Sequence, residues 1–108
     1  MKDGIYKMVF ENNGQRNGQC DGVISIRKNH LNGGDNVFFY RGIINSEGVS
    51  LRVARINPGD TTVMNGIDNV ELVLKLNESS FGANFEGHVW SRPDLTVRGS
   101  LTFLSDLL

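Results

Sequence analysis

The chain has 108 residues, of which 39% are hydrophobic and 13 are glycine, and its 11 Lys and Arg nearly balance its 12 Asp and Glu. This length and composition indicate one globular domain over 1–108 and exclude a disordered chain. The balanced charge disfavours direct nucleic-acid binding, and the longest apolar run, 37–40, is too short to cross a membrane. A single cysteine, Cys20, excludes an internal disulfide, and no apolar signal core follows Met1. We therefore expect a cytoplasmic protein.

Glycine and asparagine occur in short groups along the chain, and such groups are typical of tight turns. The runs between the groups have the length of strands. We expect strands over 4–11, 19–28, 36–45, 49–57, 69–77, 81–91 and 95–104. The segment Asn32-Gly33-Gly34-Asp35 is predicted to be a hairpin turn, and the looser stretch 58–68 has room for a short helix at 61–68.

The later runs alternate between apolar and polar residues, as Leu72 and Leu74 do with Glu71 and Lys75. This period of two is typical of an antiparallel sheet with one wet face. Connections of hairpin length favour up-and-down order, so the fold class predicted is all-β, a small antiparallel barrel of about seven or eight strands. Glycines inside the predicted strands indicate bends or close approach of backbones. They are Gly22, Gly42, Gly87 and Gly99.

The run 36–45 breaks the alternation because it is apolar at successive positions. A strand that is apolar on both sides usually has both sides covered. Two explanations stay open: the stretch 58–68 folds over the strand, or a second copy of the chain packs against it in a homodimer. The residues expected in such a dimer interface are Val37, Phe38, Tyr40 and Ile44.

No pattern for catalysis, a metal or a cofactor stands out. His30 and His88 are far apart in the sequence, and with one cysteine they do not make a zinc pattern. The glycine-rich 32–35 segment lacks the residues of a phosphate-binding loop. We expect no enzyme activity.

Large and small residues mix on the side of the sheet that should face inward. Small barrels either fill their interior with side chains or hold one small ligand. A carrier of a small apolar ligand is therefore an alternative function. The candidate cavity residues are Leu72, Phe81, Phe85, Val97 and Phe103.

Several short motifs resemble those of the GrlR family, the negative regulators associated with type III secretion gene clusters in bacteria. They are Asp3-Gly4-Ile5-Tyr6, Phe10, Gly22-Val23-Ile24, Gly33-Gly34-Asp35 and Tyr40-Arg41-Gly42. The resemblance spans most of the chain. It implies a lipocalin-like barrel, a homodimer, and repression by sequestering a helix-turn-helix activator protein away from DNA.

The chain departs from the family in one loop. The family regulator contacts its activator through a run of acidic residues between two strands. Here the corresponding loop is Asn45-Ser46-Glu47-Gly48, which has one carboxylate. The resemblance places the partner-binding site at these four residues, and a single Glu47 would attract a basic partner only weakly.

Overall fold

The computed structural model describes residues 1–12, 15–16, 21–57 and 69–108. The helix considered at 61–68 and the stretch 58–68 lie outside these residues. The described residues form strands and turns but no helix. They accordingly include no helical segment long and apolar enough to cross a membrane.

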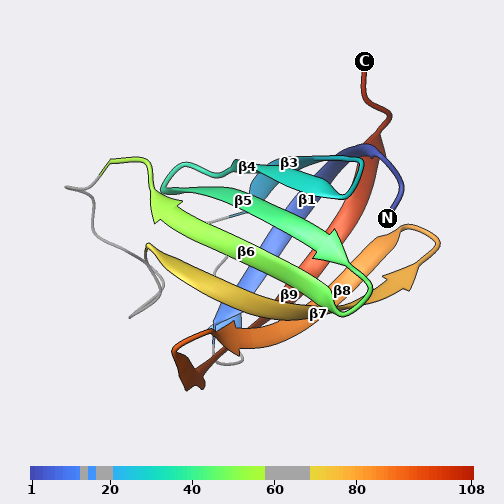
Figure 1. Ribbon diagram of the computed structural model, residues 1–108. Coiled ribbons are helices and arrows are strands. Elements are labelled where there is room, and N and C mark those ends of the chain that lie inside the picture. The colour runs from blue at the N-terminus through green and yellow to red at the C-terminus, as the bar shows by residue number, and fades with distance from the viewer. Residues whose placement is uncertain (13–14, 17–20, 58–68) are drawn as a thin grey trace.

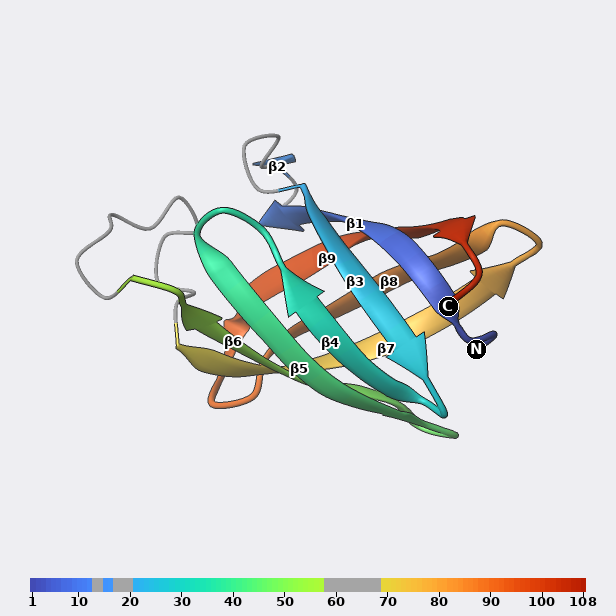
Figure 2. The same cartoon turned by 90° about the horizontal axis from the view of Figure 1, so that it is seen from above.

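The strands form one sheet that closes on itself into an antiparallel barrel, with the order β2-β1-β3-β4-β5-β6-β7-β8-β9 and an additional pairing of β1 with β9 (Figures 1 and 2). Apart from the two-residue β2, the barrel has eight strands. Their bounds are β1 Gly4–Asn12, β2 Gln15–Arg16, β3 Gly22–Arg27, β4 His30–Gly34, β5 Phe38–Asn45, β6 Gly48–Arg55, β7 Val70–Ser79, β8 Gly82–Val89 and β9 Arg92–Ser105. The expected up-and-down barrel is confirmed.

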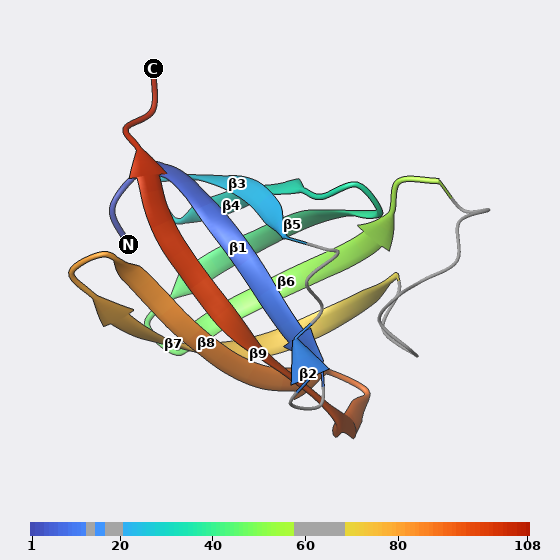
Figure 3. The same cartoon turned by 180° about the vertical axis from the view of Figure 1, so that it is seen from behind.

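The barrel closes where the first long strand meets the last. Residues 5–12 of β1 pair with residues 97–105 of β9, while residues 4–8 of β1 also pair with β3 (Figure 3). Closure leaves no free edge between these strands, so their backbone groups bond within the sheet.

Alternate residues of each strand point into the barrel and make a single apolar core. The core residues are Tyr6, Met8, Phe10, Ile24, Ile26, Leu31, Phe38, Tyr40, Ile44, Val49, Leu51, Val53, Leu72, Leu74, Phe85, Val89, Val97 and Leu101. The described residues include no buried charged or polar residue. The period of two in the sequence therefore reports the inner and outer faces correctly for most strands.

The strand β5 alternates in the same way, which corrects the predicted dimer interface. Phe38, Tyr40 and Ile44 point into the core and are at most 8% exposed, and Val37 packs against that core. The outward side of β5 carries Phe39, Arg41 and Ile43 instead. The prediction that Phe38, Tyr40 and Ile44 form a dimer surface is wrong, because the barrel interior already covers them.

The predicted turn at 32–35 is also wrong for most of its length. The chain reverses at Lys28 and Asn29, whose φ angles of 49° and 63° fit a two-residue hairpin. Asn32, Gly33 and Gly34 belong to β4. At Gly33 a Cβ atom would lie 2.3 Å from the Val23 oxygen, so this glycine allows two strands to approach closely.

Asp35 organises the turn between β4 and β5. Its Oδ1 accepts hydrogen bonds from the backbone nitrogens of Val37 at 2.7 Å and Phe38 at 2.8 Å. Its Oδ2 accepts a hydrogen bond from the buried Tyr40 hydroxyl. One carboxylate thus joins the turn to the hydroxyl of a core side chain, and hydrogen bonds of this kind offset the cost of burying a polar group.

We expect Asp35→Ala to lower the free energy of unfolding by about 2 kcal/mol or more, because it removes the acceptor for three donors. Chemical denaturation measures the change. Asn36→Ala, at an exposed position of the same turn, is the matched control and should stay within about 0.5 kcal/mol of the parent. Equal stabilities of the two variants would show that Asp35 does not hold the turn.

Candidate functional site

Aromatic rings fill the middle of the barrel. The Phe10 ring lies 5.5 Å from the Tyr40 ring and 5.3 Å from the Phe85 ring, measured between centroids. These rings come from β1, β5 and β8, so they meet across the interior. All are at most 2% exposed.

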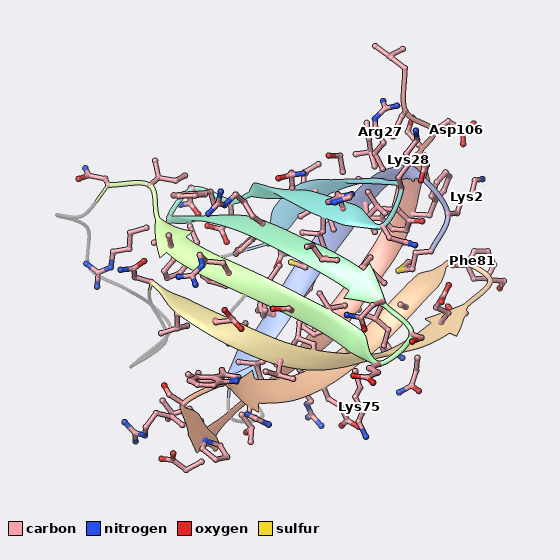
Figure 4. The ribbon with its side chains drawn as sticks, viewed as in Figure 1. Lys2, Arg27, Lys28, Lys75, Phe81 and Asp106 are labelled. Atoms are coloured by element: carbon pink, nitrogen blue, oxygen red, sulfur yellow. The ribbon has the colours of Figure 1, made fainter. Side chains whose placement is uncertain are left out.

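The structure does not bring the five candidate cavity residues together around a ligand site. Leu72, Phe85 and Val97 lie in the packed core. Phe103 is partly buried at one end, where its ring meets the Tyr6 ring edge-on at 5.4 Å. Phe81 projects from the turn between β7 and β8 and is 77% exposed (Figure 4). The prediction that Phe81 lines the interior is wrong, because strand alternation ends at this two-residue turn.

The predicted partner-binding turn lies beside a hollow of about 360 Å³ on the outside of the barrel. Asn45 shapes this turn, since its Oδ1 accepts hydrogen bonds from the nitrogens of Glu47 at 2.9 Å and Gly48 at 3.1 Å. Gly48 has a φ of +140°, and a Cβ atom there would lie 2.2 Å from the Leu74 oxygen of β7. Only glycine fits between the turn and β7 at this point.

Two further carboxylates line the same hollow. Glu78 comes from β7 and Glu86 from β8, and they join Glu47 of the β5–β6 turn. Lys75 is the cation of this group and points outward from β7 (Figure 4). The sequence alone does not reveal Glu78 and Glu86 as part of this group, because they are distant from Glu47 in the chain. The pairing of β6, β7 and β8 brings them together.

A larger hollow, of about 590 Å³, lies on the outer faces of β1, β7, β8 and β9. Its outward side chains include Asn77, Asn84 and Ser100, which are neighbours in register on adjacent strands. Gly99 permits the close approach of β1 and β9 here, since a Cβ atom would lie 1.9 Å from the Val9 oxygen. The expectation that Gly99 marks close backbone approach is confirmed.

Ion pairs tie several surface charges to one another. Arg98 of β9 contacts Glu11 of β1 at 2.7 Å, across the seam that closes the barrel. Arg92 donates two hydrogen bonds to Asp94, at 3.0 and 2.8 Å. These hydrogen bonds lower the pKa of Asp94 below its ordinary value.

The residues considered for catalysis do not converge. His30 is on β4 and His88 is on β8, and each ring lies near a backbone oxygen of its own region. Cys20 lies outside the described residues. Within the described residues, no group of three or more His, Cys, Asp or Glu side chains is arranged to hold a metal ion.

No family model matches this chain, and no curated protein matches it.

Phe38 points into the barrel and Phe39 points outward, and alanine variants of the two residues test this assignment. We expect Phe38→Ala to lower the free energy of unfolding by about 3–5 kcal/mol, because it leaves a cavity in the core. Phe39→Ala is the matched control on the neighbouring, outward position, and it should cost about 1 kcal/mol or less. Denaturant unfolding of both variants measures the difference. A larger loss of stability for Phe39→Ala than for Phe38→Ala would show that Phe39, and not Phe38, faces the interior.

Proposed function

We propose that this protein is a GrlR-like regulatory binding protein, a negative regulator that sequesters a protein partner, and that the partner is a helix-turn-helix transcriptional activator. The observation that carries the proposal is the group of carboxylates around the β5–β6 turn. Glu47, Glu78 and Glu86 line one hollow with a single cation, Lys75. The family resemblance places partner binding at this same turn.

The surface around the β5–β6 turn is more acidic than the sequence of the turn alone suggests. In the sequence, Asn45-Ser46-Glu47-Gly48 has one carboxylate where the family has a run. In the barrel, neighbouring strands add two more carboxylates beside it. DNA-binding proteins are basic where they contact phosphates, so an acidic surface attracts them and competes with DNA for the same residues.

The barrel architecture suits a scaffold that presents a turn to a partner. Asn45 accepts two hydrogen bonds within the turn, and Gly48 lets the turn lie close to β7. A rigid site loses little conformational entropy on binding. We propose that the fold is lipocalin-like, and that the protein acts in the cytoplasm, without catalysis. The alternative function as a carrier of a small apolar ligand has less support, because aromatic rings fill the middle of the interior.

Charge neutralisation at the turn tests the proposal. The parent protein is used as bait in a lysate of the source organism, and recovered proteins are identified by mass spectrometry. We expect a basic helix-turn-helix protein.

The double variant Glu47→Gln with Glu78→Gln should then bind that purified partner at least about tenfold more weakly, since charge-assisted contacts contribute about 1.5–3 kcal/mol each. Its affinity should also depend less on salt.

The matched control removes the same number of charges elsewhere. Asp94→Asn with Asp106→Asn neutralises exposed carboxylates that pair with Arg92 and Lys2 and do not line the hollow at the turn. This control should keep the parent affinity. Equal weakening by both double variants would mean that only overall charge matters. Recovery of an apolar compound and no protein on the bait would favour the carrier.

We further propose that the protein is a homodimer, and that its interface uses outward apolar residues in place of those first expected. Val23 of β3 and Phe39 of β5 each pair with Gly34 of β4, so they flank a position without a side chain. Their exposed fractions are 55% and 42%. An exposed apolar pair on either side of a glycine makes a small apolar surface that a second copy can cover.

We expect Phe39→Glu to convert the dimer to a folded monomer, because it places a charge in an apolar contact. Light scattering measures the mass, and circular dichroism checks the fold. Val73→Glu, which changes another outward apolar residue on β7, is the control and should leave the dimer intact. A Phe39→Glu variant that stays dimeric would place the interface elsewhere.

A further inference from the structure

We propose that the outer face of β4, β5, β6 and β7 binds the phosphate or sulfate group of a small molecule between Arg41 and Arg52. The proposed regulatory function uses neither arginine. The site is a hollow of about 280 Å³ whose lining includes both arginines, Asn32, Ile43 and Glu71.

The two arginines are direct cross-strand neighbours. Arg41 of β5 and Arg52 of β6 are partners in the strand register and both point outward. The Cβ atoms of such partners lie about 4.5–5.5 Å apart, and like charges in this arrangement repel each other. An anion held between them would relieve that repulsion.

The surrounding charges leave this repulsion largely uncompensated. The outward positions of β4, β5 and β6 contain no Asp or Glu. Glu71, the carboxylate of the hollow, comes from β7 and contacts Arg52 at 3.4 Å. Arg41 makes no ion pair with any of the residues that the structure describes. The site therefore has one cation in excess.

The donors that line the hollow suit a tetrahedral oxyanion. Guanidinium groups bind phosphate and sulfate through paired N–H donors, which a lysine ammonium cannot reproduce. Asn32 is the register neighbour of Arg41 on β4, and its side-chain amide adds a donor on that side. Arg41, Arg52 and Asn32 thus supply donors from three adjacent strands.

An apolar surface adjoins the arginines. Ile43 lies on the same outward side of β5, next to Arg41 in the alternation, and is 54% exposed. Its register neighbours are His30 and Ser50, which also line the hollow. The hollow therefore has room for an organic group beside the anion. We infer a small phosphorylated or sulfated molecule as the ligand class.

The experiment titrates the full chain with inorganic phosphate and with phenyl phosphate, followed by calorimetry and by the NMR signals of the arginine side chains. Sodium chloride at matched ionic strength and acetate serve as reference anions. We expect saturable binding of phosphate at Arg41 and Arg52, and severalfold tighter binding of phenyl phosphate because its ring contacts Ile43. The Ile43→Thr variant should reduce only that difference between the two probes. Equal effects of chloride and phosphate would overturn the proposal.

Variants test whether phosphate binding depends on these two arginines or only on the overall positive charge of the protein. Arg41→Gln should weaken phosphate binding about tenfold or more, and Arg41→Lys should recover only part of it. Glu71→Gln should tighten binding, because it removes the competing carboxylate. Arg92→Gln is the matched control, since Arg92 is an exposed arginine paired with Asp94. Equal weakening by Arg92→Gln and Arg41→Gln, or weaker binding by Glu71→Gln, would overturn the proposal.

Thermal unfolding gives a second, independent readout. A ligand that binds only the folded chain raises its melting temperature. Phosphate should raise the melting temperature of the parent and of Arg92→Gln but not that of Arg41→Gln. Without phosphate, Arg41→Gln should be at least as stable as the parent, because it removes a like-charge pair. Loss of stability in that variant would show that Arg41 has a structural role, and it would contradict the proposal.

Discussion

The pairing of β1 with β9 is the constraint on which the rest of the structure depends. These strands come from the two ends of the described chain, and their ladder joins residues 5–12 to residues 97–105. Once they pair, every long strand has a neighbour on both sides, and the closed sheet encloses an interior. The interior of a barrel of eight strands is just wide enough for side chains to fill it. This closure lets Phe10 of β1 meet Tyr40 of β5 inside the barrel and brings it next to Phe85 of β8, since both phenylalanines pair with Gly99 of β9.

Closure also decides which residues reach the surface. A side chain in a closed sheet has one of two directions, and a change of register by one residue would exchange them. Asp35 and the hairpin at Lys28 and Asn29 establish the register of β4 and β5. That register buries Phe38 and Tyr40 and leaves Phe39, Arg41 and Ile43 outside. The proposed dimer surface and the proposed anion site both use outward residues of β5.

Negative and positive side chains gather in different regions of the outer surface, although the chain as a whole is almost neutral. Carboxylates of β7, β8 and the β5–β6 turn surround one hollow, and arginines of β5 and β6 line another. Glu71 of β7 lies beside the arginines and compensates Arg52. Formal net charge therefore says little about the partners of this protein, because local fields depend on which strands are neighbours. The two proposed sites use opposite charges and lie on different parts of the barrel, so variants can address them separately.

The sequence by itself determined the fold class, because alternation with period two and short glycine- or asparagine-rich connections are local signals. It also marked Gly87 and Gly99 as places where backbones approach closely, and in the structure a Cβ atom added at either would lie 1.9 Å from a carbonyl oxygen of the neighbouring strand. It could not locate β4, because Gly33 and Gly34 signal a turn and a close contact equally well. Only the tertiary structure decided which side of the doubly apolar β5 faces inward, since both sides read alike in the sequence. The grouping of Glu47 with Glu78 and Glu86, and the opposition of Arg41 and Arg52, also required it, because these neighbours arise from the strand register.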